Sequence, residues 1–298
     1  MPDGPDRAGT GPGLSRLLVL GAAVLFSTGG AAIKACAVGG WQVASFRSAV
    51  ATVALLAMVP AARRGWTRRT LLVAVPYAAT LVLYTLANRL TTAASTIFLQ
   101  DTAPLYVLLL SPFLLGERFH RRDLWPAFLA AAGMALFFVG VPDASATAPR
   151  PLAGNVLAAL AGVTWALTLL GLRWVGREGA GAGAAAAAAG NLLAALAALG
   201  PALPVRDLRP ADVAVVLFLG VFQIGLAYAL LTRGMAGGEA GGGVPAFEAS
   251  LLLLLEPVLN PAWAFLVHGE RPGGLVLLGG ALVLAATAWI SARDGGSP

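Results

Sequence analysis

Long apolar runs alternate with short segments of charged residues, prolines and glycines along the whole chain. A helix needs about 20 predominantly apolar residues to cross the hydrocarbon core of a bilayer, and ten runs are of suitable length. They are residues 16–35, 41–62, 69–90, 93–116, 122–141, 152–174, 183–204, 211–233, 244–268 and 272–292. The pattern therefore predicts an all-α membrane protein with ten transmembrane helices.

Two of these runs allow a second interpretation. The seventh is rich in Ala and Gly and could instead be a flexible linker. The first, from about Leu17 to Ala35, could be a secretory signal, because Ala35-Cys36-Ala37 resembles a small-residue cleavage site. Its length and the charge of Lys34 favour an uncleaved first helix.

The composition fits a bilayer as the main solvent. Hydrophobic residues make up 58% of the chain and charged residues only 11%, whereas a soluble domain carries about 25% charged residues. The net charge of +6 does not indicate a nucleic-acid partner, because the basic residues form short clusters between apolar runs rather than one stripe. Cys36 is the only cysteine and there are two histidines, so we expect no metal site and no cofactor.

The basic residues also predict the orientation of the chain. If the N-terminus is cytoplasmic, thirteen of the twenty basic residues fall in inside segments and six in outside segments, and Arg47 lies within a span. Because cytoplasmic loops carry an excess of Lys and Arg, we expect cytoplasmic tails at residues 1–15 and 293–298. The protein would then be a multi-pass protein of the inner (cell) membrane. The bias is strong in the first half and weak in the second, where four basic residues fall on each side.

Internal repetition divides the chain into two halves, residues 16–141 and 152–292. Pro104 and Pro257 are 153 residues apart. The two Gly-Glu-Arg sequences, which begin at Gly116 and Gly269, are separated by the same 153 residues. Five spans per half is an odd number, so the second half would enter the membrane from the opposite side. Inverted repeats of this kind are typical of secondary transporters, whose substrate sites lie near the midplane.

These residues resemble a known family. Each half has an apolar span with a proline, a further apolar run and then Gly-Glu-Arg, and Arg47 stands near the start of the second span. The chain resembles the EamA-type family of the drug/metabolite transporter superfamily over residues 16–292. It departs from the pattern in a longer loop before the ninth span and in the residues before the two prolines, Ala103 and Glu256. The resemblance implies a ten-helix carrier, often an exporter of amino acids or other small metabolites, without naming the substrate.

Four ionisable side chains fall within the predicted spans: Arg47, Asp101, Glu248 and Glu256. A charge at the centre of a membrane helix costs about 2.5–3.5 kcal/mol on the insertion scale, so such residues are functional candidates. Arg47 and Glu248 lie near span ends and could snorkel to the headgroups or form structural pairs. Asp101 and Glu256 lie deeper, where a carboxylate could take up a proton or bind an amino group of a substrate.

The two repeated prolines have two interpretations. Pro104 and Pro257 are expected to interrupt the hydrogen-bond ladders of the fourth and ninth spans. They could be plain kinks for packing, or hinges and polar openings beside a cavity.

Polar and aromatic residues recur at helical spacing on several spans and are expected to line a central cavity. In the third span, Tyr77 and Tyr84 share one face with Thr80 and Asn88. The complete set of predicted cavity residues is Tyr77, Thr80, Tyr84, Asn88, Gln100, Asp101, Trp165, Thr168, Tyr228, Glu256, Asn260 and Trp263.

The favoured function is a secondary carrier for a small amphipathic metabolite, with export of amino acids as the leading case and protons as a candidate coupling ion. The first alternative is uptake of a sugar or nucleotide-sugar type solute. An enzyme is not expected, since the chain has no HExxH or GxSxG motif and no paired aspartates in the spans. A scaffold or receptor is also disfavoured, because no sizeable soluble domain is present. Substrate, direction of transport and oligomeric state are left open.

Overall fold

The computed structural model describes residues 12–114, 124–176, 181–206, 208–235, 244, 249 and 252–294, and their regular structure is entirely helical. The first half contains α1 Pro12–Ser27, α2 Gly29–Ala35, α3 Gly40–Met58, η1 Pro60–Arg63, α4 Arg68–Leu90, α5 Ala93–Gln100, α6 Ala103–Leu114 and α7 Leu124–Val139. The second half contains α8 Pro151–Gly176, α9 Ala182–Ala202, α10 Pro210–Phe218, the π-helical segment η3 Leu219–Leu226, α11 Ala227–Met235, α13 Leu255–His268 and α14 Gly274–Asp294.

Seven segments of the described chain are long and apolar enough to cross a bilayer. They correspond to the predicted spans one to four and six to eight. The Ala-rich seventh run is among them as helix α9, so it is not a linker. Apolar helices of 10–17 residues occupy the fifth and tenth positions, at Leu124–Val139 and Gly274–Trp289. In the ninth position α13 has 14 residues.

The helices place polar side chains inside the bundle and large apolar side chains outside it. On α4, Leu72 and Val75 are 61% and 55% exposed, whereas Thr80 and Asn88 are buried. This distribution is the reverse of a soluble helix. It is favourable only where the surrounding solvent is apolar, because a polar stripe facing lipid would lose its hydrogen bonds.

The fourth and ninth spans are broken at corresponding positions. A turn at Asp101 and Thr102 separates α5 from α6, and a turn at Leu254 precedes α13. The offset between Asp101 and Leu254 is 254 − 101 = 153 residues. Pro104 and Pro257 therefore lie in the first turns of α6 and α13, where a backbone N–H has no helical partner to lose. Both spans are thus interrupted just before their prolines, and each proline lies in the first turn of the second piece instead of standing inside a continuous helix.

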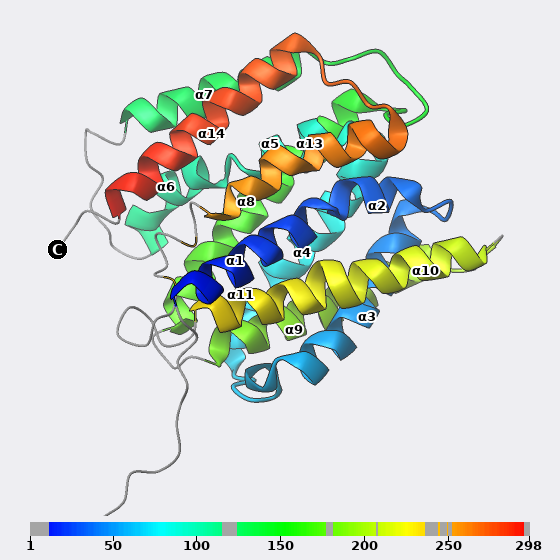
Figure 1. The fold of residues 1–298 in the computed structure, drawn as a ribbon, viewed down its shortest axis with the longest axis vertical. Helices are drawn as coiled ribbons and strands as arrows, with labels where there is room; N and C mark the ends of the chain where they lie inside the picture. The colour runs from blue at the N-terminus through cyan, green and yellow to red at the C-terminus, as the bar shows by residue number, and fades with distance from the viewer. Residues whose placement is uncertain are drawn as a thin grey trace, which may run out of the picture.

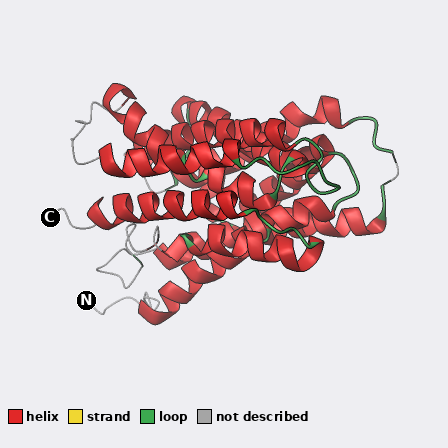
Figure 2. Ribbon diagram, turned by 90° about the horizontal axis from the view of Figure 1, so that it is seen from above, coloured by secondary structure: helices red, strands yellow, loops and turns green. Residues whose placement is uncertain are grey.

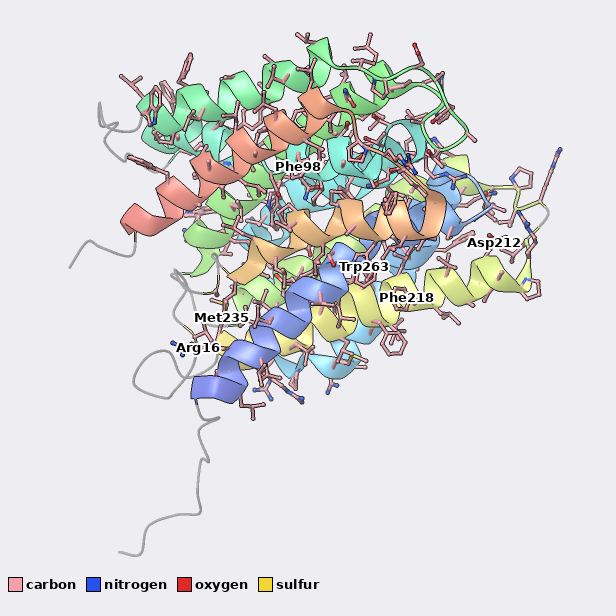
Figure 3. All side chains as sticks on the ribbon, turned by 45° about the horizontal axis from the view of Figure 1, so that its top comes forward. Arg16, Phe98, Asp212, Phe218, Met235 and Trp263 are labelled. Carbon is pink, nitrogen blue, oxygen red and sulfur yellow. The ribbon has the colours of Figure 1, made fainter. Side chains whose placement is uncertain are left out.

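The helices lie side by side with their connections gathered at the two ends of the bundle (Figures 1 and 2). One end contains the C-terminus of α2, the start of α10 and the connection between α13 and α14, and we call it the Lys34 end. Arg16 and Asp212 lie at opposite ends (Figure 3), so α10 runs antiparallel to α1. The start of α1 and the end of α14 lie together at the end opposite to the Lys34 end (Figure 1).

Helix packing follows a paired pattern between the halves. The helix α4 packs on α8 and, correspondingly, α11 packs on α1; α4 packs on α9, and η3 packs on α3. In the same way, α5 and α6 contact α8 while α13 contacts α1. Two further contacts, α3 with α9 and α7 with α14, each join equivalent spans of the two halves. Each of these pairs is therefore its own counterpart. Exchanging the two halves therefore maps the principal contacts onto one another.

Candidate functional site

The polar face of α4 forms one wall of a cluster in the centre of the bundle. Tyr77, Thr80, Tyr84 and Asn88 all lie on this face and are at most 8% exposed. The Thr80 hydroxyl donates to Thr164 Oγ1 on α8 at 2.8 Å. Asn88 donates from Nδ2 to the Tyr84 carbonyl oxygen of its own helix at 3.1 Å. The side chains of this face therefore pack against neighbouring helices and do not face lipid.

Aromatic rings from three helices meet at the Tyr77 end of this face. The rings of Tyr77 and Trp165 are 6.3 Å apart at an interplanar angle of 71°, an edge-to-face contact. Tyr228 on α11 packs into the same cluster and interacts electrostatically with the Tyr77 hydroxyl. The structure thus brings together three of the residues that the sequence predicted to line a central cavity.

At the other end of the face, Tyr84 meets the second half of the chain. Asn260 on α13 donates from Nδ2 to the Tyr84 hydroxyl oxygen at 3.3 Å, and Glu256, one turn earlier, interacts electrostatically with that hydroxyl. Gly30 makes this approach possible, because a Cβ there would stand 2.6 Å from Asn260 Oδ1. The cluster therefore joins α2, α4 and α13.

Asp101 and Glu256 lie near each other although 155 residues separate them. Their carboxyl groups interact electrostatically, and both side chains are half-buried beside the broken ends of their helices. Asp101 ends the α5 turn and its Oδ2 atom is buried with no hydrogen-bond partner. Two carboxyl groups that interact in this way repel when both are ionised, which favours a state in which one of them is protonated or a cation is bound.

Arg47 extends from α3 onto the same face of α4. It is 1% exposed, and its Nη2 donates to the Leu81 carbonyl oxygen at 3.1 Å. Its guanidinium interacts electrostatically with Tyr84 and Tyr77, which lie on either side of Leu81 along α4. The interpretation that Arg47 snorkels to the headgroups is wrong, because the side chain is directed into the bundle.

Several buried polar atoms of this cluster have no hydrogen-bond partner. They are Arg47 Nε, Asn88 Oδ1, Asp101 Oδ2, Asn191 Oδ1 and Asn260 Oδ1. Leaving a buried donor or acceptor unpaired costs about 1–3 kcal/mol. Most of these atoms belong to side chains on or beside the polar face of α4.

Three predicted cavity residues are placed differently. Trp263 donates from Nε1 to Ser27 Oγ on α1 at 2.9 Å and faces away from α4. Thr168 is buried, and its hydroxyl donates to the Thr164 carbonyl oxygen of its own helix. Gln100 is the last residue of α5, and its carbonyl oxygen lies against Gly162 of α8. Of these three, only the Trp263 side chain is shown to lie outside the central cluster.

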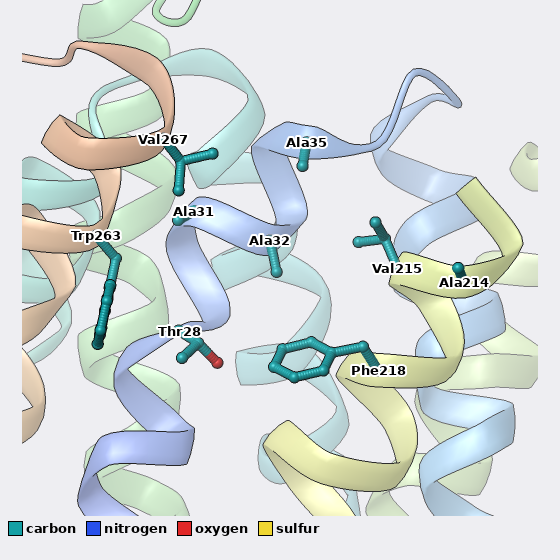
Figure 4. A pocket seen from close by; sticks show the side chains of 9 residues that line it. All are labelled: Thr28, Ala31, Ala32, Ala35, Ala214, Val215, Phe218, Trp263 and Val267. Carbon is teal, nitrogen blue, oxygen red and sulfur yellow. The ribbon is translucent and has the colours of Figure 1, made fainter. Parts of the chain in front are cut away.

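Trp263 instead lines a pocket of about 360 Å³ on the outside of the bundle (Figure 4). Its walls are α10 and α13, and its floor is α2, where only small side chains stand between the walls. The lining residues are Thr28, Ala31, Ala32, Ala35, Ala214, Val215, Phe218, Trp263 and Val267. The pocket is almost wholly apolar and offers no recognition of a charged solute.

Some predicted features lie outside the described residues. These are Glu248 and the first Gly-Glu-Arg sequence, Gly116 to Arg118. The second Gly-Glu-Arg sequence is described. Gly269 ends α13 with a left-handed φ of +68°, and the Arg271 guanidinium lies 5.9 Å from the centre of the Phe265 ring.

Glu270, the middle residue of that sequence, forms a buried ion pair with Lys34. Lys34 Nζ lies 2.9 Å from Glu270 Oε1, and both side chains are at most 4% exposed. Glu270 Oε2 also accepts from the backbone N–H of Ala93 at 2.9 Å, and Lys34 donates to the Thr91 carbonyl oxygen at 2.7 Å. This arrangement ties α2, the start of α5 and the end of α13 together. The sequence pattern indicated only an outside segment for Lys34 and did not predict the pair.

Asn191 on α9 is a second residue that the sequence pattern did not single out. It is buried, and its amide lies against the Tyr77 hydroxyl. The available signal was a lone amide in an otherwise apolar run of alanines and leucines, since such a residue rarely faces lipid.

Known proteins share both the sequence pattern and this fold. The sequence matches the EamA-like transporter family at residues 14–139 and again at residues 152–292. The chain belongs to this family. The EamA-like family is part of the drug/metabolite transporter superfamily, so the resemblance seen in the sequence is confirmed and the chain is a membrane transporter-like protein.

Individual relatives add little about function. An uncharacterized protein of Pseudomonas aeruginosa is 32% identical over 206 residues, and the alignment covers 63% of each chain. A solved structure, described only as the crystal structure of a protein, aligns with 95% of this EamA-like chain and 99% of its own length. Its TM-score is 0.59 at 22% identity, so the likeness concerns the fold alone.

Proposed function

We propose that this EamA-like protein is a secondary carrier that moves a small amphipathic metabolite by alternating access, with export of an amino acid as the favoured case. Ten spans would form two inverted five-helix halves that rock about the central cluster. The observation that carries the proposal is the repeated helix break, at Asp101 and at Leu254, which brings Asp101 and Glu256 together inside the bundle. Broken helices beside a midplane site are the usual construction of inverted-repeat transporters.

The packing of the halves supports the rocking motion. The principal helix contacts map onto one another when the halves are exchanged, so a second arrangement with the roles of the halves reversed would have similar contacts. In this structure the Lys34 end is tied by the ion pair with Glu270. Opening that end would break contacts that join the first half to the second, and similar contacts would form at the opposite end.

The chemistry of the central cluster supports an amphipathic solute. Aromatic rings at Tyr77, Trp165 and Tyr228 offer an apolar surface, and the carboxyl groups of Asp101 and Glu256 can bind an ammonium group or a proton. We place the protein in the inner membrane with both termini in the cytoplasm, since the excess of basic residues lies on that side.

Flux measurements in proteoliposomes test the proposal. Vesicles loaded with radiolabelled amino acids should release them through the wild-type protein, faster when a proton gradient is imposed. Asp101→Asn and Glu256→Gln should each lower the rate at least 10-fold and weaken its dependence on the proton gradient. Asp143→Asn, which alters an exposed loop carboxylate, is the matched control and should behave like the wild type.

Two results would contradict parts of this proposal. Folded wild-type protein that moves no solute under any gradient would exclude a carrier. Unchanged rates and unchanged pH dependence in both carboxylate variants would exclude proton coupling through Asp101 and Glu256.

A further inference from the structure

Arg47 is a buried cation for which the described part of the chain supplies no anion. The salt bridges found among the described residues join Lys34 to Glu270 and Arg209 to Asp212, and neither involves Arg47. The groups that interact most strongly with its guanidinium are the hydroxyls of Tyr84 and Tyr77 and the thiol of Cys36. All three groups are neutral at neutral pH in their ordinary state.

Among the described residues, few hydrogen-bond partners are found for Arg47. A guanidinium has five N–H donors, and the described contact is one bond, from Nη2 to the Leu81 carbonyl oxygen. That oxygen already accepts a bond from the Thr85 hydroxyl at 2.8 Å. The Nε atom is buried without a partner. An unpaired charge inside a protein is strongly unfavourable, and its cost falls when an anion with matching oxygens is bound.

The surroundings of Arg47 are those of a binding site rather than of a structural anchor. Its neighbours Tyr77 and Tyr84 belong to the central cluster, and the unpartnered atoms Asn88 Oδ1 and Asn191 Oδ1 belong to side chains beside these tyrosines. Tyr84 also interacts electrostatically with Glu256. The Tyr84 hydroxyl therefore interacts electrostatically with both the Arg47 cation and the Glu256 carboxyl group.

We propose that Arg47 is the anion-recognition residue of the central site and binds the carboxylate of the transported solute. The planar fork of the guanidinium forms two parallel hydrogen bonds with the two oxygens of a carboxylate. An amide or ester of the same solute cannot accept this charge-assisted pair of bonds. Asp101 and Glu256 face the cationic or protonated side of the solute. This inference rests on the proposed carrier function and narrows its substrates to solutes with a free carboxylate.

Transport of matched acids and amides tests the role of Arg47. The probes are radiolabelled leucine, phenylalanine and threonine, each offered to proteoliposomes as the free acid and as the amide. Wild-type protein should prefer the acids by about 10- to 100-fold, the value of one or two charge-assisted hydrogen bonds. Arg47→Gln should lose this preference while still moving the amides, and Arg47→Lys should retain part of it. Arg64→Gln, which removes an exposed arginine, is the control for net charge.

The outcomes separate this inference from the carrier proposal. Wild-type flux without a preference for acids, or a preference that survives in Arg47→Gln, would overturn the anion site and leave the carrier intact. No flux of any probe through wild-type protein would overturn both. A double-mutant cycle of Arg47→Gln with Glu248→Gln tests whether Arg47 instead forms a structural ion pair with Glu248. If the two substitutions lower the unfolding temperature by much less together than the sum of their separate effects, the proposal is also overturned. Additive effects on the unfolding temperature support it.

Discussion

Single residues at the Lys34 end show how this bundle holds buried charge. The carboxylate of Glu270 uses one oxygen for Lys34 and the other for the backbone N–H of Ala93. The start of α5 favours a negative charge, because its first N–H groups have no helical partners. Each group of the pair thus has several partners, which a buried ion pair requires to be tolerated.

Removal of the charge of Glu270 should destabilise the protein strongly. Glu270→Gln leaves Lys34 buried without an anion, and we expect a loss of about 3–5 kcal/mol of unfolding free energy. Thermal unfolding in detergent would measure it. Arg271→Gln, at the exposed neighbouring position, should cost about 1 kcal/mol or less, the size of its contact with Phe265.

A second variant distinguishes the ion pair from general damage at this position. Lys34→Met combined with Glu270→Gln removes the unpaired cation and keeps an acceptor for the Ala93 N–H. The double variant should therefore be more stable than Glu270→Gln alone. Equal or greater destabilisation would mean that the ion pair is not the source of the effect.

At the scale of helices, glycines set how closely the elements approach. Gly190 of α9 packs on the ring of Tyr77, and a Cβ there would lie 2.6 Å from Tyr77 Cδ1. Gly162 of α8 packs on the broken end of α5, where a Cβ would lie 2.9 Å from the Leu99 carbonyl oxygen. Small residues at such interfaces allow membrane helices to pack by close van der Waals contact. They hold the walls of the central cluster in position.

Gly190→Ala should displace Tyr77 and lower stability. Because the new methyl group enters a filled space, we expect a loss of about 1–3 kcal/mol, visible as a lower unfolding temperature in detergent. Gly183→Ala on the same helix is the matched control, since its nearest neighbour, Leu172 Cδ2, is 3.8 Å away. That variant should be neutral or gain up to about 1 kcal/mol from helix propensity. Equal losses in both variants would contradict the packing argument.

The whole molecule has two chemically different ends. The Lys34 end joins the halves by the buried ion pair and by the bond from the Ala37 N–H to Asp212 Oδ1. The opposite end holds Arg64 in the connection between α3 and α4, and Arg69 near the start of α4, whose guanidinium lies 5.0 Å from the centre of the Trp174 ring. In the proposed orientation, which follows from the positive-inside rule, this second end faces the cytoplasm.

Labelling of single cysteines tests this orientation. In a Cys36→Ser background, Arg206→Cys should react with a membrane-impermeant maleimide in intact cells, because residue 206 is exposed near the start of α10. Arg64→Cys, also exposed, should react only after the inner membrane is permeabilised. The reverse pattern would show that the protein is oriented with its Lys34 end toward the cytoplasm.

The sequence by itself determined the features that depend on local pattern. Apolar run length predicted helices at the first to fourth and sixth to eighth positions, and the Gly-Glu-Arg and proline repeats indicated the family. Helical spacing also placed Tyr77 and Tyr84 on one face of α4. Length, spacing and repetition are properties of neighbouring residues, so they can be read without knowing which helices touch.

Only the tertiary structure decided which of these residues meet. It paired Asp101 with Glu256 and Lys34 with Glu270, and it directed Trp263 toward Ser27 instead of the centre. It also located the break of the fourth span at Asp101 and Thr102, just before Pro104, whereas the sequence indicated only that the proline would interrupt the span. Contacts between distant helices depend on their rotation and close approach, which small residues such as Gly30 permit but do not by themselves specify.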